Sequence, residues 1–177
     1  MSVELNVAAR PLTAADIPAV ADLVSRVYDE LGPLRGGALL LAQQGRRLPC
    51  GESLAADLAD PSTMLFVGTI DDAALGWACA ETRELADGSR LGVVREIGVL
   101  AEARGVGIGE ELLGLAVAWC RANRCRGIDS FALPGARETK NFFETFGFTA
   151  RLLVVHTSLV EAVDEPVDDP IGDPVAS

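Results

Sequence analysis

The sequence predicts an α/β protein with a central mixed β-sheet and helices on both of its faces. Two observations predict this class. Three strand-like segments joined by turn signals lie in the middle of the chain, and helical and strand-like segments alternate after them. Strands joined by hairpins pair antiparallel, whereas strands joined through a helix pair parallel, so the sheet is expected to be mixed. The 177 residues are 49% hydrophobic but only 5% aromatic, which predicts a single core built mainly of Leu, Val, Ile and Ala.

The first third of the chain predicts one strand and three helices. Residues 4–10 alternate between apolar and polar positions, as in a half-buried strand, and apolar residues then recur at helical spacing from Ile17 to Leu31. Thr13 or Asp16 is expected to cap that helix, with Pro18 in its first turn. Two short helices are expected at 38–44 and 53–59, within an irregular region that also holds Arg35, Arg46 and Arg47. Such arginines are usually solvated, although they also suit a substrate carboxylate.

The rest of the chain predicts a three-stranded meander followed by alternating helices and strands. Asp87-Gly88 is a strong signal for a hairpin turn, and Gly147 suits the C-terminal end of a helix. The expected strands are 64–70, 75–82, 91–100, 128–133 and 151–159, and the expected helices are 107–124 and 138–146. We therefore predict one domain over residues 1–160, followed by an acidic, proline-containing, disordered tail at 161–177.

Charge and composition exclude several classes of function. The formal charge is −11, and without the six acids of 161–177 the remaining 15 basic and 20 acidic residues still give −5. This balance disfavours a nucleic-acid partner, which requires a basic surface. No apolar run resembles a signal peptide or a membrane span, so we expect a soluble, cytoplasmic protein with no membrane partner. The four cysteines are not arranged in Cys-x-x-Cys pairs and there is one histidine, His156, so no metal site is expected.

The stretch from Arg95 to Gly109 carries the clearest functional signal. A strand-like run ends at Leu100, a loop follows with glycines at 105, 107 and 109, and a helix begins directly after it. The free N–H groups of a first helical turn bind anions, and glycine lets a phosphate approach the backbone closely. The stretch therefore predicts an anion-binding turn.

Three motifs in this sequence together resemble a known enzyme family. Arg104-Gly105-Val106-Gly107-Ile108-Gly109 is similar to an Arg/Gln-x-x-Gly-x-Gly/Ala signature, and Glu96-Ile97-Gly98-Val99 resembles a Glu-Leu-Tyr-Val strand segment. Asn141-Phe142-Phe143-Glu144-Thr145-Phe146-Gly147-Phe148 resembles a Phe-Tyr-Glu-x-x-Gly-Phe element. All three occur, in this order, in GNAT-type N-acetyltransferases, and the resemblance covers about residues 3–159.

The resemblance implies an acyl-CoA N-acyltransferase fold and acetyl-CoA as cosubstrate. It implies transfer of the acetyl group to a primary amine of a small molecule or protein, by direct attack of the amine on the thioester, and it allows a homodimer. It further implies that the strand at Val99 and Leu100 splays from the strand at 131–133, leaving room for the pantetheine arm. The cofactor-binding residues implied are Val99, Leu100, Arg104, Gly105, Val106, Gly107, Ile108, Gly109 and Phe143.

The resemblance also points to catalytic candidates. An amine must be neutral to attack, so a base is needed, and Glu96 is the first candidate because family members often carry an acid on this strand. The other interpretation of Glu96 is a strand carboxylate paired with Arg83 or Arg95, and Asp129 is a second acid. Many family members have a tyrosine as general acid where this chain has Phe143, which has no proton to donate. Tyr28, the only tyrosine, is the alternative acid, unless it is simply a packed residue of its helix.

Two other functions fit parts of the pattern. Asp129 follows Gly109 at the distance of a ribose-binding acid in dinucleotide-binding proteins, but Glu110 stands where the third glycine of that motif belongs. A non-catalytic acyl-CoA-binding sensor or regulatory module of the same fold is the second alternative, and Phe143 favours it. The glycine loop together with Glu96 favours an enzyme.

Overall fold

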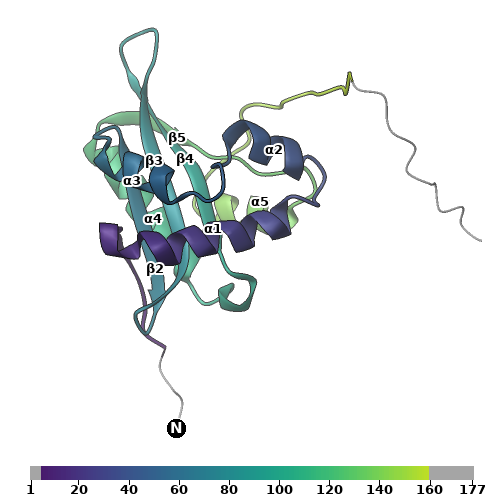
Figure 1. Ribbon diagram of the computed structural model, residues 1–177. Coiled ribbons are helices and arrows are strands. Elements are labelled where there is room, and N and C mark those ends of the chain that lie inside the picture. The colour runs from purple at the N-terminus through teal and green to yellow at the C-terminus, as the bar shows by residue number, and fades with distance from the viewer. Residues whose placement is uncertain (1–4, 160–177) are drawn as a thin grey trace, which may run out of the picture. The chain divides into compact units, whose positions relative to one another are not determined.

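The computed structural model describes residues 5–159, and the tail predicted to be disordered, 161–177, lies outside the described residues (Figure 1). The chain separates into two compact units, residues 1–140 and 141–177. The prediction of a single domain over 1–160 stays a prediction.

A mixed sheet forms the centre of the first unit, as predicted, but with five strands among the described residues where six were expected. Its spatial order is β1-β2-β3-β4-β5, in which β1 to β4 pair antiparallel and β4 pairs parallel with β5. The strands are β1 (Val7–Pro11), β2 (Thr63–Ile70), β3 (Ala73–Glu84), β4 (Arg90–Val99) and β5 (Cys125–Asp129). The β3–β4 hairpin turns at the predicted Asp87-Gly88, where Gly88 has φ +78°.

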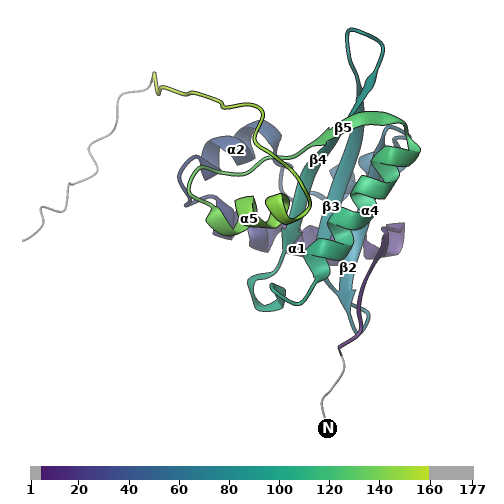
Figure 2. The same cartoon turned by 180° about the vertical axis from the view of Figure 1, so that it is seen from behind.

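Helices cover both faces of this sheet, which confirms the predicted class. The helix α4 (Ile108–Ala122) lies across one face, and α1 (Ile17–Leu31) and α3 (Gly51–Ala59) lie on the other (Figures 1 and 2). The helix α2 (Gly37–Gln44) follows α1, and short 3₁₀ turns occupy Ala14–Asp16 and Ala101–Ala103. Pro18 lies in the first turn of α1, as expected, where its missing N–H costs no helical hydrogen bond.

The core between the sheet and α1 is built from apolar side chains that are almost completely buried. Trp77 and Leu65 of the sheet pack with Val20 and Val24 of α1 and Leu54 of α3. On the opposite face, close approach of α4 depends on glycines in the strands. A Cβ at Gly68 would lie 2.5 Å from Ile108 Cγ2, and one at Gly92 would lie 2.5 Å from Cys120 Sγ. The small residues of β2 and β4 therefore set how closely α4 packs.

The second unit begins within α5 (Arg137–Thr145), which was predicted at 138–146. Phe142 and Phe143 have ring centroids 5.3 Å apart, and Phe148 lies 5.3 Å from Phe143, so the aromatic residues of the motif pack on one another. Gly147 adopts φ +79° just after the helix, as a glycine at this position is expected to do.

Two predicted strands differ from the structure. The predicted strand 128–133 is placed earlier, as β5, and residues 130–133 are not in a strand. The predicted last strand, 151–159, is not a strand at all: its side chains are exposed, from Leu152 at 74% to Leu159 at 95%. His156, which lies within the predicted strand 151–159, is exposed as well. Alternating apolar residues give strand propensity, but a strand also needs a hydrogen-bonding neighbour, and residues 141–159 include no strand.

Candidate active site

The glycine loop adopts a conformation that only glycine adopts easily. Gly105 has φ +77°, and Gly107, which directly precedes α4, has φ +103°. The N–H groups of residues 105–107 donate no hydrogen bond to any described residue, and a Cβ at Gly105 would meet nothing within 4 Å. These open amides stand at the N-terminus of a fifteen-residue helix, so the loop has the backbone geometry of an anion cradle.

Arg104 fastens this loop to the end of β4. Its Nε donates to the carbonyl oxygen of Val99 at 2.9 Å, and its Nη2 lies 2.6 Å from Glu30 Oε2 of α1. In the structure the Arg104 side chain therefore ties the loop to the end of β4. Its charge faces Glu30, an exposed pair that contributes little to stability.

The pairing of β5 with β4 ends before β4 does. The resemblance implied that two strands splay, one at Val99 and Leu100 and one at 131–133, but residues 131–133 form no strand. The last pair between the two strands is Val93 with Asp129, and Ser130 Oγ then donates to the Val94 carbonyl at 3.3 Å. From there β4 runs on to Val99, while residues 130–136 form no strand. Among the described residues, the β5-facing edge of β4 has no strand partner between this point and the glycine loop, so it can accept an added strand.

A β-bulge aims two consecutive side chains at the same face of the sheet. In the β3–β4 register, Cys79 pairs with Glu96 and Ala80 pairs with Val94, so Arg95 is the extra residue. Side chains normally alternate between faces, but here Glu96 contacts α1 and Arg95 contacts α3. Because of the bulge, an acid and a base that are adjacent in sequence both face the helices α1 and α3.

Glu96 and Tyr28, the two candidate catalytic residues, are in direct contact. The Tyr28 hydroxyl donates to Glu96 Oε1 at 2.6 Å, and the Glu96 side chain is 7% exposed. The backbone N–H of Arg46 donates to the Tyr28 oxygen at 2.8 Å, while Arg46 Nε donates to Glu96 Oε2 at 2.8 Å. The fold thus brings together two residues that the sequence indicated, from positions 68 residues apart.

The partner of Glu96 is neither of those proposed from the sequence. Arg83 pairs with Glu81, and Arg95 pairs with Asp57 and, at 3.3 Å, with Glu81. Arg46, expected to be solvated or to contact a substrate carboxylate, is instead buried, with its side chain 4% exposed. Its Nη2 lies 2.7 Å from both Glu96 Oε2 and Asp57 Oδ2, without a favourably angled hydrogen bond to either, so these contacts are ion pairs.

These contacts join six residues into one cluster, the Glu96 cluster, which consists of Glu96, Tyr28, Arg46, Asp57, Arg95 and Cys79. Burial and charge shift several pKa values within it. Burial raises the pKa of the Tyr28 phenol, and the charge of Glu96 and its hydrogen bond raise it further. Burial alone lowers the pKa of the Arg46 guanidinium, but Glu96 and the neighbouring acids outweigh it, and the net shift is upward. Burial raises the pKa of Cys79 to about 12, although Arg95 acts in the opposite direction. At neutral pH the cluster therefore holds a protonated phenol, a charged guanidinium and a protonated thiol.

Sequence reasoning missed the roles of Arg46 and Asp57. Arg46 lies in the connection between α2 and α3, and Asp57 lies in α3. No sequence motif marks either residue. In the structure the other arginines of that region, Arg35 and Arg47, are exposed and only Arg46 is not. Which of the three turns inward depends on how the connection packs, and the sequence alone does not show this.

The predicted site residues belong to both units, with Phe143 in the second unit and the others in the first. Val99, Leu100 and residues 104–109 surround the end of β4 and the start of α4. Phe143 is buried at 7% exposure beside Phe142 and Phe148, and its contact with a cofactor remains a prediction. Asp129 ends β5 at the last pair with β4, and nothing tests a catalytic role for it.

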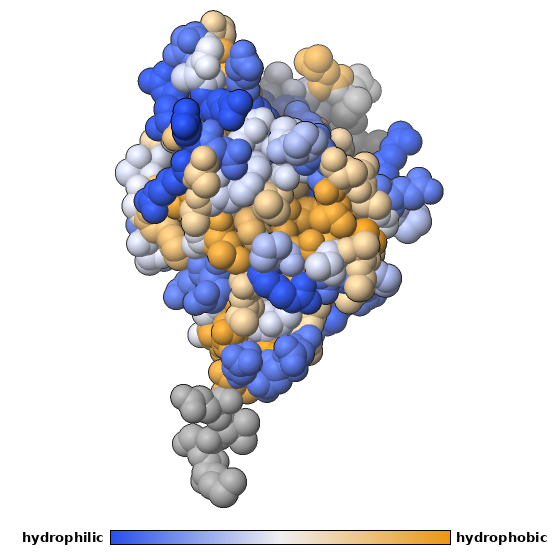
Figure 3. Space-filling view, turned by 90° about the vertical axis from the view of Figure 1, so that its left-hand side faces the viewer, coloured by the Kyte–Doolittle hydropathy of each residue, from blue (hydrophilic) through white to orange (hydrophobic). Residues whose placement is uncertain are grey.

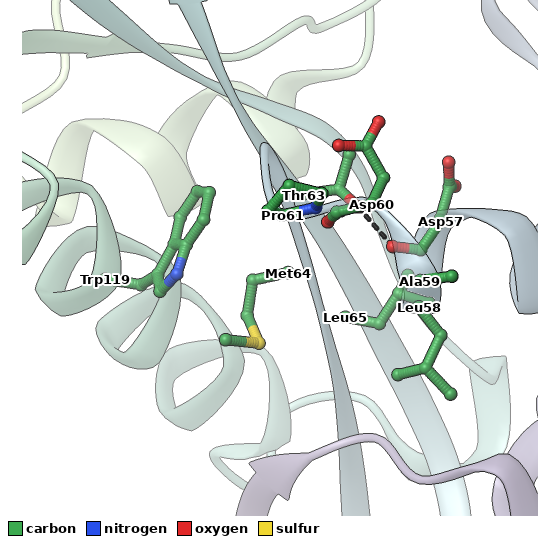
Figure 4. Close-up of a pocket in the computed structure, with 9 residues that line it drawn as sticks. All are labelled: Asp57, Leu58, Ala59, Asp60, Pro61, Thr63, Met64, Leu65 and Trp119. Atoms are coloured by element: carbon green, nitrogen blue, oxygen red, sulfur yellow. Dashed lines mark hydrogen bonds between the residues drawn. The ribbon is translucent and has the colours of Figure 1, made fainter.

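A separate pocket of about 260 Å³ lies between α4, α3 and the start of β2 (Figure 4). Trp119 and Met64 face each other across it, and the carboxylate of Asp57 points away from the space between them. On the side of the molecule drawn in Figure 3, hydrophobic residues form a band between hydrophilic residues above and below. The pocket shares only Asp57 with the Glu96 cluster, so it does not open onto the candidate catalytic residues.

Comparison with known proteins agrees with this geometry. The model of the GNAT acetyltransferase family matches residues 33–148, which include the glycine loop, Glu96 and the aromatic motif. No curated protein matches. Solved structures with the same fold include the aminoglycoside N-acetyltransferase AAC(6')-Iy in complex with CoA, with 20% identity and a TM-score of 0.66, covering 89% of this chain and 97% of that one.

Two further structures show how widely the fold is used. The aminoglycoside acetyltransferase meta-AAC0020 from an uncultured soil metagenomic sample, in complex with sisomicin, has 16% identity and a TM-score of 0.66, covering 87% and 95% of the two chains. A transcriptional regulator from Bacillus halodurans C-125 has 18% identity and a TM-score of 0.66, covering 86% and 99%.

The chain belongs to the GNAT acetyltransferase family, as its sequence motifs indicated. The family supports acetyl transfer as the general activity. In the part of the chain that the structure describes, no cluster of side chains suits a metal ion. Among the same residues, no helix has the length and apolar character needed to cross a bilayer.

Proposed function

We propose that the protein is an acetyl-CoA-dependent N-acetyltransferase that acetylates a primary amine by direct attack of the amine on the thioester. The observation that carries the proposal is the open edge of β4, which leads from the Glu96 cluster to the glycine loop. One end of that path offers free amides for a pyrophosphate, and the other offers a carboxylate for proton removal. The aminoglycoside acetyltransferases that share this fold support a small-molecule amine as acceptor.

The residues of the first unit fit acetyl-CoA. The amides of Gly105, Val106 and Gly107, with those of the first turn of α4, would hold the pyrophosphate, and the unpaired edge of β4 near Val99 would take the pantetheine arm as an added strand. The bound thioester supplies the activated acetyl group. The carbonyl oxygen of Val99 already accepts a hydrogen bond from Arg104. It would accept a second hydrogen bond from the pantetheine arm through its other lone pair, or Arg104 would move away.

Glu96 would remove the proton that the amine loses, directly or through water. Its carboxylate already accepts from Tyr28 and Arg46, but a carboxylate has about four acceptor sites, so it can still receive a proton. The new N–C bond forms as the C–S bond breaks, and the departing thiolate needs a proton. Tyr28 is the candidate donor, with water as the other source. Its raised pKa makes the phenol a poor acid, whereas a thiol has a pKa near 8.5, so departure as a thiolate that water protonates is feasible.

The alternative function is a non-catalytic acyl-CoA-binding sensor or regulatory module. Phe143 favours it because phenylalanine has no proton for the thiolate, and the Bacillus halodurans protein of this fold is described as a transcriptional regulator. The retained glycine loop, which together with Glu96 favours an enzyme, would bind the cofactor in either function, so by itself it does not separate them. The contact between Glu96 and Tyr28 favours the enzyme, since it places two proton-handling groups beside the open edge of β4.

The experiment that separates the two measures free thiol released from acetyl-CoA when a panel of amines is added. The panel should contain amino acids, polyamines and aminoglycosides, because nothing in the site fixes the acceptor. Thiol release that depends on one class of amine supports the enzyme. Tight binding of acetyl-CoA without release on any amine supports the sensor.

A further inference from the structure

One arginine contacts both candidate catalytic residues through two different groups. The backbone N–H of Arg46 donates to the Tyr28 oxygen at 2.8 Å, and its side-chain Nε donates to Glu96 Oε2 at 2.8 Å. The Tyr28 hydroxyl in turn donates to Glu96 Oε1 at 2.6 Å, which closes a ring of three residues. Each of the three comes from a different segment: α1, the connection between α2 and α3, and β4.

The far side of the guanidinium is fixed as well. Arg46 Nη2 lies 2.7 Å from Asp57 Oδ2, and Nη1 donates to Ser53 Oγ at 3.3 Å. Asp57 also pairs with Arg95, the bulge residue next to Glu96. A guanidinium that is only 4% exposed is expensive to bury unless carboxylates match it, and here Glu96 and Asp57 both do. The planar fork of arginine can meet several acceptors at once in a fixed geometry.

We propose that Arg46 is a positioning residue for acetyl transfer: it holds the Glu96 carboxylate and the Tyr28 phenol in one fixed arrangement at the open edge of β4. Without it, the Glu96 carboxylate keeps one hydrogen bond and is free to rotate about its last bond. This inference rests on the proposed function. It names a residue that no motif of the family marks, and it predicts an effect on turnover that is separate from cofactor binding.

The test compares Arg46→Gln and Arg46→Lys with a control, Arg126→Gln. Arg126 pairs with Asp87 in the β3–β4 hairpin, where both side chains are more than half exposed. With the most active amine of the panel, Arg46→Gln should lower kcat by about 30-fold or more and leave the KM for acetyl-CoA within about 2-fold. Arg46→Lys should recover part of this loss, to a kcat about 5-fold below wild type, because an ammonium keeps the charge but not the fork. Arg126→Gln should leave both constants unchanged.

A purely structural role gives a different pattern. If Arg46→Gln lowers kcat no more than the control does, the proposal is overturned. It is also overturned if kcat, the KM for acetyl-CoA and the thermal midpoint all deteriorate together and Arg46→Lys recovers none of them. If Arg46→Gln does not fold, Arg46→Lys decides: a reduced kcat with an unchanged KM for acetyl-CoA supports positioning, and an unchanged kcat refutes it.

One readout separates this inference from the proposed function. Tyr28 is the only tyrosine in the chain, so a ¹³C label on the ring carbon that bears its hydroxyl reports this residue alone. If wild type turns over no amine, the proposed function fails, but the resonance still tests whether the Arg46 side chain holds the phenol through the Glu96 carboxylate, because Arg46→Gln keeps the backbone N–H that donates to Tyr28. A change in the chemical shift of this carbon in Arg46→Gln that is absent in Arg126→Gln supports the positioning of Tyr28 by Arg46. An unchanged resonance in both overturns it.

Discussion

The contact between Gly68 and the first turn of α4 yields the sharpest stability prediction. Gly68 lies on β2, and a Cβ added there would be 2.5 Å from Ile108 Cγ2 and 3.2 Å from two atoms of Leu112. Carbon atoms normally approach to about 3.5–4.0 Å, so in Gly68→Ala the first turn of α4 must move away by roughly 1 Å. Ile108 is 1% exposed, so it has no solvent-facing space to move into.

The expected cost follows from overpacking. Inserting a methyl group into a packed core typically costs about 1–3 kcal/mol. For a chain of this size each kcal/mol lowers the thermal midpoint by about 2–4 °C, so Gly68→Ala should lose roughly 2–12 °C. Because the same turn carries the glycine loop, the variant should also bind acetyl-CoA more weakly.

A double-mutant cycle isolates the contact. Ile108→Ala removes the clashing Cγ2 and should itself cost about 2–5 kcal/mol, as truncations of buried isoleucine do. In that background Gly68→Ala should cost less than in wild type, with a coupling of about 1–2 kcal/mol. The free energies come from urea unfolding followed by circular dichroism.

The control makes the same substitution, glycine to alanine, at an open position of α4, the helix that packs on Gly68. A Cβ at Gly114, inside α4, would meet nothing within 4 Å. Gly114→Ala should therefore stabilise the protein by about 0.5–1 kcal/mol, because alanine favours the helix. Strict additivity of Gly68→Ala and Ile108→Ala would refute the reasoning, since the cost would then not come from this contact.

Three further outcomes are expected. Gly107→Glu should abolish measurable acetyl-CoA binding by calorimetry, because φ is +103° there and the new carboxylate would repel a pyrophosphate. Glu96→Gln should leave acetyl-CoA binding nearly intact and lower turnover by about 10²-fold or more, read as thiol release. In the native protein at pH 8, burial keeps the pKa of Cys79 and of Cys120 at about 12, so both thiols should alkylate far more slowly than Cys125, which is partly exposed. Their rates should rise with pH, since only the thiolate reacts.

Each of these outcomes can fail in a recognisable way. Unchanged affinity in Gly107→Glu would remove the loop from the cofactor site, and wild-type turnover in Glu96→Gln would move the base elsewhere. Peptide mapping after brief alkylation identifies which thiols reacted. Labelling of Cys79 as fast as Cys125 would show that the core beneath β3 opens readily.

Local signals in the sequence determined most of the elements. Helical spacing and caps placed α1 to α5 within a few residues, because an amphipathic helix needs only its own hydrogen bonds and one apolar face. The meander was equally predictable from its turns, above all Asp87-Gly88, where Gly88 adopts φ +78°. The predicted strand at 151–159 was wrong because a strand is completed by a partner, which its own residues do not contain.

For the candidate site, the sequence by itself determined the glycine loop and Glu96, and only the tertiary structure decided what surrounds them. Gly105 and Gly107 are recognisable because a backbone with positive φ at a helix start restricts the residue type. Arg46 and Asp57 follow no such restriction: many polar residues are compatible with their local backbone. They form the ion-paired cluster because the Arg95 bulge turns Glu96 toward α1 while the α2–α3 connection folds inward. Burial of charge is a property of the packed chain, so it became visible only when these segments came together.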